Sequence, residues 1–141
     1  MPTPKQTPLQ KIPRTPLGDL VHEFLEYLEI ELSRSPRTLD GYARTLTSFL
    51  QDSGCQEPSD ITAESVRRYR VFLNRKEIEP GVTLKKTTQN YHIIVLRTFL
   101  KFLAKRDIET LAAEKIDIGK TPDREVDFLE YDEVLALIQT A

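Results

Sequence analysis

The chain has 141 residues, of which 39% are hydrophobic and 30% are charged, a composition that is ordinary for a soluble domain with one core. No apolar run is long enough to cross a bilayer, and residues 1–16 contain no hydrophobic stretch typical of a secretory signal. Cys55 is the single cysteine, which excludes an intramolecular disulfide. We therefore expect a cytoplasmic protein without a membrane partner.

The net charge of −2 argues at first against a nucleic-acid partner, but the charges are segregated along the chain. Residues 17–31 hold five acids and no base, whereas residues 85–106 hold six bases and no acid. A polyanion responds to the local field of a patch, so this distribution keeps DNA binding open. A merely solvated charged face explains the charges equally well.

Residues 1–16 contain five of the nine prolines and three bases without an acid, which predicts a flexible basic arm. From Leu17 to Leu32, apolar residues recur at steps of three and four, as in an amphipathic helix. The opposite face of this helix is acidic, so we expect it to point away from any phosphate backbone.

The second and third predicted helices have clear start signals. Ser35 is a suitable N-cap with Pro36 at the first helical position, and Ser53 and Gly54 end the helix. Thr62 is the expected N-cap of the third helix, flanked by a hydrophobic staple. The staple pairs Ile61 with Val66, and Tyr69, Phe72 and Leu73 complete the expected core side.

The fourth predicted helix, Thr87 to Lys105, is apolar around most of its circumference, so we expect it to be the central helix. Residues 107–127 lack a strong apolar periodicity, which predicts a tether with one short helical turn. A new amphipathic pattern begins at Phe128 and runs into the C-terminus, which suggests that the chain stops inside a longer protein. These patterns predict an all-α, compact bundle of four to five helices.

The sequence offers no catalytic, metal or cofactor motif. It has no glycine-rich phosphate loop, no paired cysteines with zinc spacing and no nucleophile elbow. His22 and His92 lie 70 positions apart, without ligand spacing to other histidines or cysteines. We therefore expect no catalytic residue, metal, cofactor or small-molecule substrate in this chain.

Two helix faces remain as candidate binding surfaces. On the second helix, residues within about 80° of arc are Arg37, Gly41, Arg44, Ser48 and Gln51. On the fourth helix, residues within about 60° are Lys86, Asn90, Arg97 and Lys101, with Lys85, Thr87, Thr88 and Gln89 at its start. These residue types suit phosphate contacts and base reading in a major groove, and the missing side chain of Gly41 would let a backbone or a phosphate come close. The alternative is a solvated face.

Several segments resemble tyrosine site-specific recombinases of the lambda integrase and Xer type. The segments are Ser35-Pro36-Arg37-Thr38-Leu39 with Tyr42, Arg44, Leu46 and Phe49; Asp60-Ile61-Thr62 with Val66, Tyr69 and Leu73; Lys86-Thr87-Thr88 with residues 96–103; and residues 128–138. The resemblance covers residues 18–141 in order. Glu130, where the family often has Ser or Thr, and Glu109-Thr110, where it commonly has Asn-Pro, depart from the pattern.

The resemblance implies a SAM-like core-binding domain that clamps double-stranded DNA at a recombination site. It implies a separate catalytic domain whose first arginine lies beyond Ala141, and action as a tetramer with other recombinase subunits. The DNA-binding candidates are Arg34, Arg37, Thr38, Arg44, Lys85, Lys86, Thr88, Asn90, Arg97 and Lys101.

The expected division is a disordered arm at 1–16, the DNA-binding domain at 17–106, a linker at 107–127 and the truncated start of the catalytic domain at 128–141. The alternative function is a non-catalytic helical protein-interaction module. Such a module would engage a partner helix through apolar surface residues such as Ile30, Ile93 or Val95.

Overall fold

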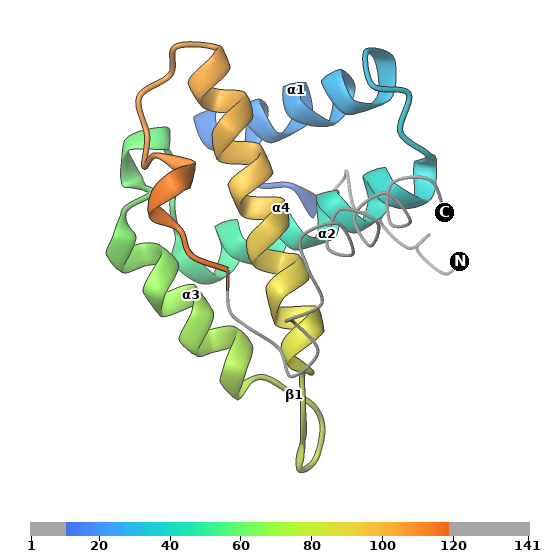
Figure 1. Ribbon diagram of the computed structural model, residues 1–141, viewed down its shortest axis with the longest axis vertical. Helices are drawn as coiled ribbons and strands as arrows, with labels where there is room; N and C mark the ends of the chain where they lie inside the picture. Colours follow the sequence, from blue (N-terminus) through green and yellow to red (C-terminus); the bar gives the residue numbers. More distant parts are fainter. Residues whose placement is uncertain (1–10, 119–141) are drawn as a thin grey trace, which may run out of the picture.

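A computed structural model of the chain describes residues 11–118. Its elements in chain order are α1 (Pro16–Ile30), α2 (Pro36–Ser53), the 3₁₀ turn η2 (Pro58–Asp60), α3 (Ala63–Arg75), β1 (Glu77–Glu79), β2 (Val82–Thr83), α4 (Lys86–Lys105) and the 3₁₀ turn η3 (Ala113–Lys115). The predicted helical bundle is confirmed (Figure 1). The short antiparallel hairpin of β1 and β2 was not expected, since residues 77–83 show too little alternation to predict strands.

The helices begin and end at the predicted residues because the caps are local. The Ser35 hydroxyl accepts a hydrogen bond from the backbone N–H of Thr38, and Pro36 occupies the first helical position. Thr62 and Ser65 form a reciprocal capping box at the start of α3. Gly54 ends α2 with a φ of 73°, a left-handed conformation that glycine adopts without strain.

Helix α4 is the central element, as its sequence predicts. It contacts α1, α2, α3 and η3, and Figure 1 shows it crossing the middle of the bundle. Phe99 and Leu103 of α4 are almost completely buried. The Phe24 ring of α1 packs against Phe99 and Phe102, with centroid distances of 5.4 and 5.2 Å. This packing holds α1 against α4.

The predicted arm differs from the structure over residues 11–16. Ile12 is buried in the core, and α1 already begins at Pro16, capped by the Thr15 hydroxyl. Composition suggested a free arm, but one apolar side chain and one capping hydroxyl are enough to hold this stretch against the bundle. Residues 1–10 of the predicted arm lie outside the described residues.

Residues 107–118 also differ from the free tether that we expected. Ile116 and Ala113 are buried, and η3 is the single short turn predicted for this stretch. The Thr110 hydroxyl donates to the Pro58 carbonyl at 3.0 Å, which ties the segment to η2. The remaining linker and the predicted helix from Phe128 lie outside the described residues. Within residues 11–118, no helix has the length and hydropathy needed to span a membrane.

Candidate nucleic-acid interface

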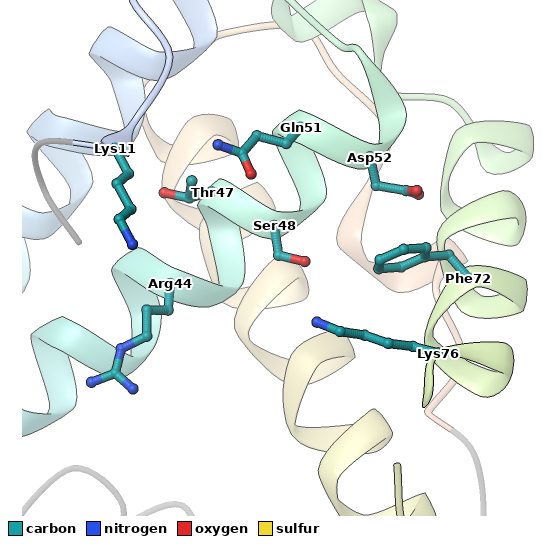
Figure 2. A pocket seen from close by; sticks show the side chains of 8 residues that line it. All are labelled: Lys11, Arg44, Thr47, Ser48, Gln51, Asp52, Phe72 and Lys76. Carbon is teal, nitrogen blue, oxygen red and sulfur yellow. The ribbon is translucent and has the colours of Figure 1, made fainter. Parts of the chain in front are cut away.

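A groove of about 400 Å³ lies between α2 and α3, which we call the α2 groove (Figure 2). Its lining side chains are Lys11, Arg44, Thr47, Ser48, Gln51, Asp52, Phe72 and Lys76. Of the predicted α2 face, Arg44, Ser48 and Gln51 line this groove. Cations come from three places in the sequence: the segment before α1, helix α2 and the end of α3.

The α2 groove is positively charged. Lys11, Arg44 and Lys76 face a single acidic side chain among its lining residues, Asp52. The Lys76 ammonium lies 5.7 Å from the centre of the Phe72 ring, a cation–π contact that holds the lysine at the α3 wall. Desolvation raises the pKa of Asp52, and this one carboxylate faces three cations across the groove. An anion is the ligand that such a groove favours.

A polar network beneath the groove joins three helices. The buried Tyr69 hydroxyl of α3 donates to the Ser48 hydroxyl of α2 at 3.2 Å and lies 3.2 Å from Nδ1 of His92 on α4. Burial raises the pKa of Tyr69 to about 12. Burial, and then the charge of Lys76, lower the pKa of His92 to about 4. Both groups are therefore neutral at pH 7 and fix the groove walls without adding charge.

Of the candidates on and before α2, Arg37 and Arg44 are exposed and free to meet a ligand. Thr38 is only 2% exposed, and its hydroxyl accepts a hydrogen bond from Ser35 at 3.1 Å. Its proposed role as a DNA contact does not fit this position, because residue 38 faces the core one step around the helix from Arg37. Arg34 is half-buried, and its backbone N–H donates to the Leu28 carbonyl.

Gly41 makes room for a side chain of this protein and not for a phosphate. A Cβ atom at this position would lie 2.7 Å from the Tyr91 hydroxyl of α4, closer than a van der Waals contact allows. The missing side chain thus lets α2 and α4 pack closely. The sequence identified the glycine but could not identify its neighbour.

The first turns of α4 contain both exposed and buried candidates. Lys85 and Lys86 are exposed, and the Lys86 ammonium donates to Oδ1 of Asn74 on α3 at 3.3 Å. Thr88 is half-buried. Asn90 is 9% exposed, so the DNA contact predicted for it does not fit its position beside α3.

The C-terminal half of the predicted α4 face is covered at Arg97 but not at Lys101. Arg97 is half-buried, and its Nε donates to the Ala113 carbonyl of η3 at 3.2 Å. Through this hydrogen bond Arg97 holds the segment after α4 against the helix. Its helical position had predicted a DNA contact. Lys101 remains exposed. The predicted α4 face is therefore interrupted by η3, which lies in the stretch that the sequence predicted to be a linker.

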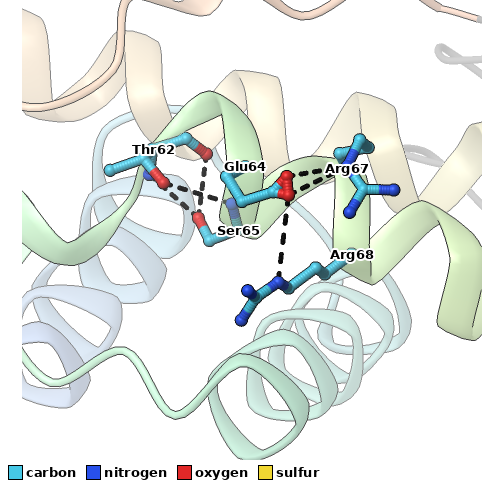
Figure 3. A network of polar contacts seen from close by, with 5 residues as sticks. All are labelled: Thr62, Glu64, Ser65, Arg67 and Arg68. Atoms are coloured by element: carbon cyan, nitrogen blue, oxygen red, sulfur yellow. Dashed lines mark hydrogen bonds and ion pairs between the residues drawn. The ribbon is translucent and has the colours of Figure 1, made fainter.

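Helix α3 contributes cations that our sequence reasoning overlooked. Residues 63–76 contain five bases and one acid, a ratio that the charge count along the chain could have found. Figure 3 shows Glu64 beside the capping box, with its carboxylate 2.7 Å from Arg67 and 3.9 Å from Arg68. The side-chain hydrogen bond from Arg67 lowers the pKa of Glu64. Glu64 therefore pairs with Arg67 and Arg68. Arg70, Arg75 and Lys76 lie further along the helix.

The described residues also bear on other kinds of site. Within residues 11–118, no group of three or more histidines, cysteines and acids could hold a metal ion. Cys55 is buried, and its thiol donates to the Asp60 carbonyl at 3.4 Å. Ile93 and Val95, two of the three residues suggested for a protein-interaction face, are buried in the core. Ile30 is 72% exposed.

The sequence profile of the phage integrase N-terminal SAM-like domain matches residues 21–107. The chain belongs to this family. The match runs from within α1 to just past α4, and it confirms the resemblance to tyrosine recombinases.

Curated relatives point the same way. Tyrosine recombinase XerC of Pelobacter propionicus is 27% identical over 128 residues, which cover 89% of this chain and 41% of the relative. Tyrosine recombinase XerC of Bacillus pumilus is 32% identical over 89 residues, covering 63% of this chain and 28% of the relative. Tyrosine recombinase XerD of Mycobacterium leprae is 29% identical over 122 residues, covering 83% and 39%. The chain thus spans less than half the length of these relatives, and no solved structure matches it.

Proposed function

We propose that this chain binds duplex DNA as the core-binding domain of a tyrosine recombinase. The observation that carries the proposal is the α2 groove, which is concave, lined by hydrogen-bonding side chains, and bordered by Lys11, Arg44 and Lys76. Membership of the phage integrase N-terminal domain family supports it. In this role the chain positions DNA, and cleavage of the strands belongs to other parts of the whole protein.

The cations would contact phosphates and set the position of the duplex. Arg44 and Lys76 border the groove from α2 and α3, and Arg37 lies two helical turns before Arg44 on the same face. Ser48 and Gln51 can form hydrogen bonds with base edges between the phosphate rows. Lys85 is the N-cap of α4, and its side chain accepts no hydrogen bond from the helix. The first backbone N–H groups of α4 would therefore favour a phosphate.

We propose further that the whole protein exchanges DNA strands as a tetramer at recombination sites. The relatives are named tyrosine recombinases, and the match to the phage integrase N-terminal SAM-like domain supports this proposal. The acidic outer face of α1 would then point away from the DNA, because its carboxylates repel phosphates.

The salt dependence of binding tests the proposal. If affinity comes largely from phosphate neutralisation, the logarithm of affinity falls by about 0.9 per phosphate contact for each unit of log salt, so four to six contacts give a slope near −4 to −5. Arg44→Gln and Lys76→Gln should each flatten the slope by about one. Lys105→Gln removes an equal charge outside the groove and should leave the slope unchanged. Binding that ignores salt, or that responds equally to all three substitutions, would contradict the proposal.

A further inference from the structure

We propose that residues 11–15, which we call the strap, are a positioning element for DNA and seat one phosphate of the duplex between Lys11, Arg44 and Thr47. The choice of a DNA phosphate as the ligand rests on the proposed function, whereas the docking of the strap and the shape of the seat do not. The strap lies outside residues 21–107, the stretch that matches the phage integrase N-terminal domain. The contact that it adds is therefore not one that the family match supplies.

Several contacts hold the strap and the start of α1 in place. The Ile12 side chain is 5% exposed and belongs to the core. The Thr15 hydroxyl accepts a hydrogen bond from the backbone N–H of Gly18 at 3.0 Å and so caps α1. In the first turn of the helix, the backbone N–H of Leu17 donates to the Gln56 carbonyl at 2.8 Å. A buried side chain near one end of the strap and a helix cap at the other give it a defined path.

Gly18 sets how closely the strap crosses the start of α1. A Cβ atom at this position would lie 1.8 Å from the Pro13 carbonyl oxygen, far inside a van der Waals contact. Because this oxygen belongs to the backbone, a side chain at residue 18 would force the strap away from the helix. Gly18 is therefore a positioning residue: it lies outside the α2 groove, but the place of Lys11 depends on it.

The strap brings Lys11 to the α2 groove, which it lines together with Arg44 and Thr47 of α2. Figure 2 shows the Lys11 side chain extending toward Arg44, and the Thr47 hydroxyl pointing toward Lys11. Two cations from separate segments thus converge beside one hydroxyl. Since the backbone of Lys11 is already held, less conformational entropy is lost when an anion binds there.

The Thr47 hydroxyl lacks a partner within the described fold. Thr47 is 6% exposed, and its Oγ1 is one of two buried side-chain polar atoms without a hydrogen-bond partner among the described residues. A threonine in a helix can bond back to its own turn, as Thr98 does through the Ile94 carbonyl at 2.9 Å. Thr47 makes no such bond. A buried hydroxyl without a partner is unfavourable, and an anion oxygen in the seat would remove this cost.

The chemistry of the seat favours a phosphate group. The planar guanidinium of Arg44 donates in parallel directions that match two oxygens of one phosphate, and the Lys11 ammonium adds a point charge. Thr47 would complete the seat as an uncharged donor. A phosphate held in this way fixes the distance between the DNA backbone and α2, which sets the register in which Ser48 and Gln51 meet the bases.

Salt titrations with a short duplex test the role of the strap. Lys11→Gln should flatten the salt slope by about one, so that affinity falls about 3.5-fold less when salt rises fourfold. Arg14→Gln is the matched control, because Arg14 is exposed on the same strap but does not line the groove. Its slope should equal that of the parent protein. Equal effects of the two substitutions would overturn the seat.

Variants that release the strap test positioning apart from charge. Gly18→Ala should flatten the slope toward that of Lys11→Gln, and the double variant should be no flatter than Lys11→Gln alone. Ile12→Ala removes the buried anchor of the strap and should act in the same way. Thermal unfolding verifies that both variants are folded. If folded Gly18→Ala and Ile12→Ala keep the slope of the parent protein, the strap does not position Lys11.

Thr47→Val should have opposite effects on stability and on binding. Valine has nearly the same shape without the hydroxyl, so it removes the unpaired polar atom and should raise the melting temperature of the free protein. It should weaken DNA binding but keep the salt slope, because no charge is lost. If Thr47→Val binds DNA as tightly as the parent protein, the hydroxyl is not part of the seat.

Inorganic phosphate separates this inference from the proposed function. It should shift the amide signals around Arg44 and Thr47 in nuclear magnetic resonance spectra of the parent protein and of Arg14→Gln, but not of Lys11→Gln. Such shifts in a chain that binds no duplex would support the seat and contradict the proposed function. Salt-dependent DNA binding that Arg44→Gln and Lys76→Gln weaken but Lys11→Gln does not would retain the proposed function and overturn the strap.

Discussion

Acid should destabilise this protein through His92. Its pKa is lowered to about 4 in the folded state by burial, against an ordinary value of 6.5. The unfolded chain therefore binds a proton at a higher pH than the folded chain does. Stability is fully present above pH 6.5 and falls as the pH drops toward 4. From these two values, the loss between pH 7.5 and pH 5 is about 2 kcal/mol, since one pKa unit is worth about 1.4 kcal/mol.

Urea unfolding at a series of pH values, followed by circular dichroism, measures this loss. His92→Asn keeps a polar atom near the Tyr69 hydroxyl but removes the titrating group, so its free energy of unfolding should lose about 2 kcal/mol less than that of the parent protein between the two pH values. His22→Asn is the matched control, because His22 is exposed on α1. Its pH dependence should equal that of the parent protein.

One result would refute the reasoning. If His92→Asn and the parent protein lose the same stability between pH 7.5 and pH 5, protonation of His92 is not resisted by the fold. The network of Ser48, Tyr69 and His92 would then be open to water, and its role in fixing the walls of the α2 groove would be wrong.

Three further predictions concern packing. Phe99→Ala should cost about 3–5 kcal/mol of unfolding free energy, because it leaves a cavity beside Phe24; a loss below 1 kcal/mol in urea titrations would mean that the core is misassigned. Gly41→Ala should cost up to about 2 kcal/mol, because the clash with the Tyr91 hydroxyl costs about 1–3 kcal/mol and the helix propensity of alanine returns about 1 kcal/mol; Tyr91→Phe should relieve the clash, and a double mutant as unstable as the single one would exclude it. Arg97→Met should speed amide exchange in residues 108–116 and leave DNA affinity unchanged; a drop in affinity with unchanged exchange would return Arg97 to the DNA contacts.

The sequence predicted the helices well because their signals are local. The caps at Ser35 and Thr62, the breaker Gly54 and the apolar steps of α4 each depend on residues within one or two turns. The tie of Thr110 to Pro58 joins positions 52 residues apart, and no local pattern reports it. The docking of residues 107–118 therefore could not be predicted.

The candidate site was predictable only where the helical face stays in solvent. Arg44 lies on the predicted face and lines the α2 groove. Asn90 and Arg97 share a face of α4 by angle, but α3 and η3 cover that face, and angle alone does not reveal a neighbour. Thr38 was a candidate through the resemblance to the family. In the structure its hydroxyl accepts a hydrogen bond from Ser35 at the start of α2.

The cations of α3 were present in the sequence but were overlooked for a different reason. Charge was counted over segments with no opposite charge, and Glu64 interrupts the basic run of α3. The structure shows that Glu64 pairs with the first two arginines, which leaves Arg70, Arg75 and Lys76 beyond its reach. Pairing within a helix, and not the segment total, decides which charges remain for a ligand.

Mapping the surface that DNA covers tests the central claim most directly. Amide chemical shifts of the chain, followed by nuclear magnetic resonance while a duplex is added, report this surface residue by residue. The account predicts the first and largest changes at residues 44–51 of α2 and 72–76 at the end of α3, with the outer face of α1 around Glu26 unchanged. Changes centred on the acidic face of α1, or no changes at the α2 groove at saturating duplex, would contradict it.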